Sequence, residues 1–218
     1  MSASLPPMTS TSQAIVPSEY ANASLGGCHE YIIPALFELC PELGPSTRVL
    51  DVGCGNGSVA AEIAKRGCKI VGIDMSETGI RLARQRCPNG RFEVLPADAK
   101  LLANLGEEPF DVVYSLEVIE HLYDPLSFVA GCFSATRPGG KFVCSTPYHG
   151  YVKNLVISLV DGWDRHHVAT EVGEHIKFFS RRTLSKLLEQ AGFRDLEFRG
   201  GGRAPYLWKS MVMSGARP

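Results

Sequence analysis

The sequence contains no pair of cysteines in a CxxC pattern, although it has seven cysteines among its 218 residues. An odd number of cysteines in a chain of this length does not fit the disulfide framework of small secreted proteins. No apolar run approaches the roughly 20 residues that a membrane-spanning helix needs. The N-terminus also lacks the basic and apolar regions of a signal peptide and the arginines of a mitochondrial presequence. These absences predict reduced thiols, no transmembrane segment and a cytoplasmic location.

Basic residues are missing before Arg48, whereas the stretch from Lys177 to the C-terminus is rich in them. The net charge is nevertheless only −1, so no overall field favours a nucleic acid or an anionic membrane. The basic C-terminal stretch is either an ordinary solvated face or a surface that attracts an acidic substrate or partner, and the sequence leaves both open. A nucleic-acid partner is therefore disfavoured, and a homodimer stays open.

Composition and periodicity divide the chain into an arm and one domain. Residues 1–17 are rich in Ser, Thr and Pro and predict a flexible N-terminal arm, followed by a single domain over 18–218. Strands are expected at 48–52, 69–73, 91–94, 110–116 and 141–146, with helices after the first, second and fourth of them, and two closing strands are expected at 194–199 and 206–214. A helix is expected over 28–40 and another over 180–191. This alternation predicts an α/β fold, with a Rossmann-like seven-stranded sheet and helices on both faces.

The alternation breaks after the fifth expected strand, over about residues 147–179. This segment holds four of the six histidines and several aromatic residues. A segment inserted at the carboxyl end of a strand lies where open α/β sheets bind ligands. We therefore predict a substrate lid, whose aromatic side chains either line a ligand pocket or form the lid's own small core.

A glycine-rich loop follows the first expected strand. Its spacing is GxGxG, at Gly53, Gly55 and Gly57, and not the GxGxxG that cradles a dinucleotide pyrophosphate. Asp51 lies two residues before the first glycine, where a negative charge would repel a pyrophosphate but would suit an ammonium group. Asp74, at the end of the second strand, can accept hydrogen bonds from both hydroxyls of a ribose. Asp98 follows the third strand, near the expected place of an adenine. Ammonium, ribose and adenine without pyrophosphate describe S-adenosylmethionine.

The segments DVGCGNG, GIDMS, ADA, FDVVYSLEVIEHL and PGGKFVCSTP stand in this order in the sequence. Together they resemble the class I S-adenosylmethionine-dependent methyltransferases over about residues 45–215. Within that class the Glu-x-x-Glu-His run and the later EHIKFFSRRTL are most similar to the ubiquinone-pathway (3-demethylubiquinol) O-methyltransferase group. The resemblance implies that loop glycines contact the methionine part of the cofactor, that residues 75 and 98–99 flank the adenine and that Leu116 lies beside the sulfonium. The predicted cofactor-binding residues are Asp51, Gly53, Cys54, Gly55, Asn56, Gly57, Asp74, Met75, Asp98, Ala99 and Leu116.

A second group of polar residues follows the fourth strand. In a helical turn, Glu117, Glu120 and His121 would share one face and point into the crevice at the strand ends. Two carboxylates and an imidazole can bind Mg²⁺ or another divalent cation. His175 is the fourth candidate ligand, because plant small-RNA 2′-O-methyltransferases have a similar Glu-x-x-Glu-His run and a distant His before Lys and aromatic residues. The candidate catalytic residues are His121, Glu120 and His175. A bound metal, a metal-free His121 base and a purely structural role all stay open.

These residues predict an O-methyltransferase that acts on a hydroxyl of a small molecule, such as a phenol or a catechol, with divalent-metal assistance as an option. Methyl transfer needs the acceptor to be aligned with the sulfonium and, for an oxygen acceptor, to lose its proton. Methylation of a sugar or RNA 2′-hydroxyl, N-methylation and a non-catalytic cofactor-binding subunit remain the alternatives.

Overall fold

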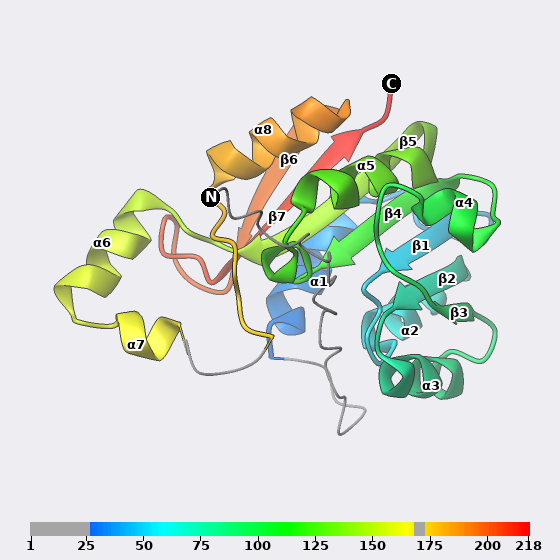
Figure 1. The fold of residues 1–218 in the computed structure, drawn as a ribbon, viewed down its shortest axis with the longest axis horizontal. Coiled ribbons are helices and arrows are strands. Elements are labelled where there is room, and N and C mark those ends of the chain that lie inside the picture. Colours follow the sequence, from blue (N-terminus) through cyan, green and yellow to red (C-terminus); the bar gives the residue numbers. More distant parts are fainter. Residues whose placement is uncertain (1–26, 168–172) are drawn as a thin grey trace, which may run out of the picture.

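The computed structural model describes residues 27–167 and 173–218. The predicted arm over residues 1–17 lies outside them. Helices and strands alternate along the chain (Figure 1) in the order α1 (His29–Leu39), β1 (Arg48–Val52), α2 (Ser58–Ala64), β2 (Lys69–Asp74), α3 (Glu77–Arg86), β3 (Arg91–Val94), α4 (Leu101–Leu105), β4 (Phe110–Leu116), the 3₁₀ turn η1 (Ile119–His121), α5 (Pro125–Ala135), β5 (Thr136–Pro147), α6 (Tyr151–Leu159), α7 (Trp163–His166), α8 (Arg181–Ala191), β6 (Arg194–Gly201) and β7 (Ser210–Ala216).

The strands form one seven-stranded sheet in the order β3-β2-β1-β4-β5-β7-β6. Strands β1 to β5 are parallel, and β7 pairs antiparallel to both β5 and β6. The strand order reverses between β1 and β4, which pair directly from Val49 with Val112 to Asp51 with Tyr114. In open α/β sheets, the carboxyl ends of the strands at such a reversal border the ligand crevice. The predicted fold class is confirmed.

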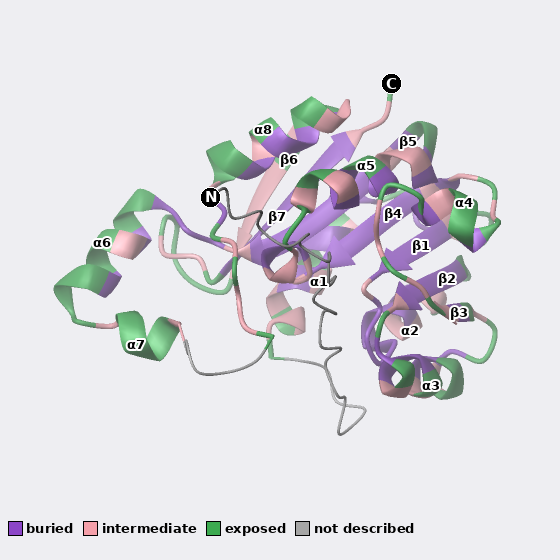
Figure 2. Cartoon of the chain, viewed as in Figure 1, coloured by how far each residue is buried: buried purple, intermediate pink, exposed green. Residues whose placement is uncertain are grey.

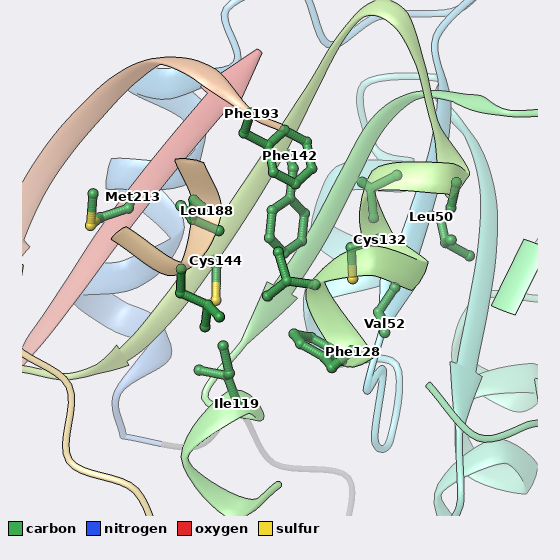
Figure 3. Packing of buried hydrophobic residues seen from close by; sticks show 14 of the residues in the cluster. Leu50, Val52, Ile119, Phe128, Cys132, Phe142, Cys144, Leu188, Phe193 and Met213 are labelled. Carbon is green, nitrogen blue, oxygen red and sulfur yellow. The ribbon is translucent and has the colours of Figure 1, made fainter. Parts of the chain in front are cut away.

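Helices cover both faces of the sheet, and the strands between them are buried (Figure 2). On one face, α4, α5 and α8 pack on a core that includes Leu50, Phe128, Phe142 and Phe193, seen closely in Figure 3. The rings of Phe142 and Phe193 stack with centroids 5.2 Å apart. On the other face, α1, α2 and α3 pack on a second core. Burial on both sides agrees with the nearly continuous apolar sequences of the central strands.

Side-chain caps fix where three of the helices begin. Ser76 accepts a hydrogen bond from the Gly79 amide at the start of α3. Ser180 and Thr183 form a reciprocal capping box at the start of α8. Asp124 caps α5, and each such cap contributes about 1 kcal/mol to stability. These caps therefore help to place the loops between strand ends and helices, where the candidate site lies.

The sequence placed most elements correctly but misjudged the first residue of two strands. The fifth strand begins at residue 136 and not at 141, because Thr136 already pairs with Phe110 of β4. Gly139 continues the strand with a φ of 72°. The last strand begins at Ser210 and not at 206, since the chain turns over residues 202–209. The segment after β5 contains α6 and α7, which extend away from the sheet at the left of Figure 1. That this segment acts as a lid stays a prediction.

Within the described residues, no helix has both the length and the apolar character needed to span a membrane.

Candidate active site

The glycine loop folds over the end of the neighbouring strand. The amides of Gly53 and Cys54 both donate to the carbonyl oxygen of Ile73, at 2.8 and 2.9 Å. Gly53, Gly55 and Gly57 all have positive φ values, of 83°, 50° and 72°. A side chain on Gly53 would collide with Val118, which belongs to the segment after β4. The glycine loop therefore packs against the segment that carries the second group of polar residues.

Two acids on neighbouring strands lie beside this loop. Asp74, at the end of β2, accepts hydrogen bonds from the amides of Gly55 and Ser76, each at 2.8 Å. Asp51 is buried on the adjacent strand and accepts a hydrogen bond of 2.6 Å from the Tyr114 hydroxyl. Burial raises the pKa of Asp51 to about 7, and the nearby charge of Asp74 adds to this effect, whereas the Tyr114 hydrogen bond opposes it. A buried carboxyl group of this kind gains from a cation placed beside it.

The remaining predicted cofactor residues lie along the same edge of the sheet. Met75 follows β2 and is exposed, and Leu116 is buried at the end of β4. Asp98 follows β3, where its side chain accepts a hydrogen bond from the Lys100 amide at 2.8 Å. Ala99 donates through its amide to Ser127 of α5, at 3.1 Å. Of the two other loop residues, Cys54 is buried, and Asn56 accepts from the Ser58 amide at 3.2 Å. Their contacts with a cofactor stay a prediction.

Glu117 does not join the other candidate metal ligands. It has a φ of 55°, and the helical turn expected from residue 117 begins only at Ile119. Its carboxylate accepts hydrogen bonds from the hydroxyls of Ser145, at 2.8 Å, and Ser210, at 3.2 Å. The expectation of one shared helical face for residues 117, 120 and 121 is therefore wrong for Glu117, because the left-handed residue turns its side chain towards β5 and β7.

The structure does bring Glu120, His121 and His175 together. The Nε2 atoms of His121 and His175 lie 4.0 and 3.9 Å from the Glu120 Oε1 atom, and one ligand atom from each residue lies within 4.8 Å of the other two. The amides of Ile176 and Lys177 both donate to the Glu120 carbonyl oxygen at 2.9 Å, which fixes the distant segment beside η1. This trio is the arrangement that could hold a divalent cation.

Glu120 is a buried carboxyl group without a well-formed hydrogen bond among the described residues. Its side chain is fully buried, and within the described part of the chain neither carboxylate oxygen has a hydrogen-bond partner of good geometry. The nearby Thr146 hydroxyl lowers the pKa of Glu120, but the two side chains do not form a hydrogen bond of good geometry. Burial, followed by the charge of Glu117, raises the pKa of Glu120 well above its ordinary value. Burial and the neighbouring His121 lower the pKa of His175. Two imidazoles and a buried, unpaired carboxyl group match the donor set of a divalent-cation site.

A pocket of about 280 Å³ adjoins this trio and is strongly basic. His175 lines both the trio and the pocket. The sequence pointed to a basic C-terminal stretch, which supplies part of this lining, but it gave no sign of the buried lysine on α6. The four cationic side chains of the lining are Lys153, Arg165, Arg203 and Lys209.

Comparison with known proteins agrees with this fold. A family described as a methyltransferase domain matches residues 28–197. A ubiquinone biosynthesis O-methyltransferase of a Ruegeria species is 33% identical over 168 residues, which cover 74% of this chain and 66% of the relative. Another, from Roseobacter denitrificans, is 33% identical over 181 residues, covering 80% and 71%. This chain thus spans about two thirds of the length of these relatives.

Solved structures show the same fold. A magnesium protoporphyrin IX methyltransferase from Synechocystis, with bound S-adenosylhomocysteine, superposes with a TM-score of 0.63 at 19% identity, covering 86% of this chain and 81% of that one. A methyltransferase from Archaeoglobus fulgidus gives a TM-score of 0.64 at 17% identity, covering 85% and 93%. The chain belongs to the S-adenosylmethionine-dependent methyltransferases. Within that family it is similar to the ubiquinone biosynthesis O-methyltransferases, and the resemblance inferred from its motifs is confirmed.

Proposed function

We propose that this protein transfers the methyl group of S-adenosylmethionine to a hydroxyl of a small phenolic or catechol-like acceptor, with the help of a divalent cation. The observation that carries the proposal is Glu120, which is fully buried between two histidines and has no well-formed hydrogen bond among the described residues. It lies two residues after Val118, which packs against Gly53 of the glycine loop. Relatives named for O-methylation in ubiquinone biosynthesis support a hydroxyl acceptor.

The cofactor site follows from the strand ends. S-adenosylmethionine supplies an activated methyl group on a sulfonium that is a good leaving group. Asp74 would bind the ribose hydroxyls while its two amide partners hold the carboxylate in place. Asp51 would offset the charge of the ammonium group, and Leu116 would exclude water beside the sulfonium. The positive φ values of the loop glycines allow the backbone to approach the methionine part closely.

The acceptor side follows from the trio. Glu120, His121 and His175 would hold the cation, which would supply Lewis acidity that lowers the pKa of an acceptor hydroxyl. Glu117, held by Ser145 and Ser210, would position β5 and β7 against the turn that carries Glu120. A metal-free alternative uses His121 alone as the base, and the partial exposure of its side chain, at 35%, favours its access to an acceptor.

The test is S-adenosylhomocysteine release with catechol, with and without EDTA. We expect EDTA to abolish release and Mg²⁺ or Mn²⁺ to restore it. Release that is indifferent to EDTA would exclude the cation and leave His121 as the base. Absence of release from catechol would redirect the search to sugar hydroxyls, amines and RNA, and absence of release with any acceptor would favour a non-catalytic cofactor-binding subunit.

Two matched variants locate the cation. Glu120→Gln should weaken Mn²⁺ binding, measured by calorimetry, on the order of tenfold or more, because it removes the one carboxylate of the trio. Glu117→Gln should weaken binding less, since its carboxylate faces two serine hydroxyls. An equal loss in both variants would place Glu117 among the ligands, as the sequence alone predicted.

A further inference from the structure

The pocket beside the trio has a lining of one sign of charge. Four cationic side chains and four histidines face it, and among the residues that the structure describes no carboxylate does. The chain as a whole is slightly acidic, with a net charge of −1, so this concentration of cations is a local feature. A concave site lined by one sign of charge raises the local concentration of ligands of the opposite sign.

Lys153 is the buried cationic residue of the pocket lining. It projects from α6 with an exposed fraction of only 6%, and its Nζ donates to the carbonyl oxygen of Lys209 at 3.3 Å. Within the described residues it makes no ion pair with a carboxylate. Burial and the charge of Arg203 lower the pKa of Lys153 to about 8, while Glu117 opposes them. A buried ammonium without a counter-ion is costly, and an anion in the pocket would relieve that cost.

The surroundings of Lys153 add further positive charge at the rim. Arg165, Arg203 and Lys209 are exposed residues that line the same pocket. Within the described chain, none of the three forms an ion pair. Guanidinium groups bind carboxylates and phosphates in a bidentate manner, and a lysine serves as a point charge. The lining therefore suits a small oxyanion with one buried and several peripheral contacts.

We propose that the methyl acceptor carries an oxyanion, a carboxylate or a phosphate, which binds in this pocket between Lys153 and Arg203. His175 joins the pocket to the trio, so an anion held by Lys153 would place the rest of a small aromatic acceptor next to Glu120 and His121. This inference rests on the proposed function and narrows its substrate class from phenols and catechols in general to acidic ones. It also gives a role to the basic residues near the C-terminus.

The experiment compares two probes that differ only in charge, 3,4-dihydroxybenzoate and 3,4-dihydroxybenzamide. Binding of each to the full-length protein is measured by calorimetry with S-adenosylhomocysteine and Mg²⁺ present, and turnover is measured separately with S-adenosylmethionine. The acid should bind on the order of tenfold more tightly than the amide, as expected for hydrogen bonds to a charged group. Equal affinities would overturn the proposal, as would no binding of either the acid or inorganic phosphate.

Three variants test whether the preference for the acid over the amide arises in this pocket. Lys153→Met keeps the side-chain volume and should bring the acid-to-amide affinity ratio close to one. Arg203→Gln, at an exposed position, should lower the ratio even if Lys153→Met does not fold. Lys65→Met removes an exposed lysine directly after α2 and should keep the wild-type ratio. A ratio that survives both pocket variants would overturn the proposal.

The two proposals fail in different ways. Preferential binding of the acid without methylation of either probe would support the anion pocket and contradict O-methylation of catechols. Methylation of both probes with equal affinity and equal efficiency would support O-methylation and contradict the anion pocket.

Discussion

Burial of Asp51 favours its neutral form in the ligand-free protein, whereas its predicted role beside an ammonium group needs the charged form. It is a buried acid within the glycine motif, and its pKa lies at about 7, raised chiefly by burial. The ordinary pKa of an aspartate is 3.8. Between these two pH values the folded protein keeps a proton that the unfolded chain has released. The contribution of Asp51 to stability is therefore greatest below pH 4 and declines as the pH rises towards 7.

Replacement of Asp51 by asparagine should therefore stabilise the ligand-free protein increasingly as the pH rises. Asparagine carries no charge at any pH and can still accept the hydrogen bond from Tyr114. Relative to the wild type, the free energy of unfolding of Asp51→Asn should increase by about 3 kcal/mol between pH 5 and pH 8. Urea denaturation of both proteins at the two pH values measures this difference, and a difference that does not change with pH would contradict the assignment.

The same variant should bind S-adenosylmethionine less well. If Asp51 offsets the ammonium charge, its loss should raise the dissociation constant at pH 8 on the order of tenfold. Calorimetry on the two proteins measures the change. Unchanged affinity would leave Asp51 with only the role of holding Tyr114.

Single residues also show how far the sequence could predict the site. The spacing of the glycines and the places of Asp51 and Asp74 at strand ends follow from a local pattern, so the sequence was enough for them. The backbone conformation of Glu117 was not predictable, because a left-handed glutamate has no sequence signal. The burial of Lys153 depends on how α6 folds back towards residue 209, which is a tertiary contact.

At the scale of elements, the crossing of α2 and α3 depends on Gly57. This residue caps α2 with a φ of 72°, and a side chain there would meet the Cα and Cβ atoms of Ala83 in α3 at 2.7 Å. Helix α2 begins directly after the glycine loop, so any displacement of it moves the cofactor site as well. The glycine is needed both for its backbone conformation and for the close approach of α3.

Gly57→Ala should destabilise the protein by more than Gly106→Ala does. Gly106 also has a positive φ, of 67°, but a side chain there would meet nothing within 4 Å. The Gly106 variant thus measures the left-handed backbone cost alone, about 1–2 kcal/mol, and the Gly57 variant adds the collision with α3. Urea denaturation gives both values. Equal losses of unfolding free energy in the two variants would show that α3 can shift to accommodate the new side chain without destabilising the protein.

The elements that the sequence missed share a physical cause. Helix α4 has five residues and α7 has four, too few to show a helical period. Helix α6 exposes several apolar residues, among them Tyr151 and Leu159, so its apolar pattern does not mark a buried face. Long, doubly buried strands were identified well, because their apolar runs and flanking turn residues are both local signals.

At the scale of the whole molecule, the reversal of strand order brings the two halves of the candidate site together. Strands β1 and β4 are neighbours in the sheet although they are distant in sequence, and each ends in one half of the site: the glycine loop after β1 and the trio's turn after β4. The β5-to-α8 connection then adds His175 through its backbone contacts with Glu120. Cofactor and acceptor would therefore meet on one rigid edge of the sheet, and binding there should stabilise the whole fold.

The last prediction uses this linkage between the site and global stability. S-adenosylhomocysteine at 100 times its dissociation constant should add about 2.7 kcal/mol to the free energy of unfolding. For a chain of this size that corresponds to a rise in Tm of roughly 5–10 °C, measured by thermal denaturation. Asp74→Asn should lose most of this rise at the same ligand concentration, because it weakens the predicted ribose contact. Asp111→Asn is the matched control, since Asp111 pairs with Arg137 near the opposite end of the sheet. It should lower the starting Tm but keep the full ligand-induced rise, whereas an undiminished rise in Asp74→Asn would contradict the ribose contact.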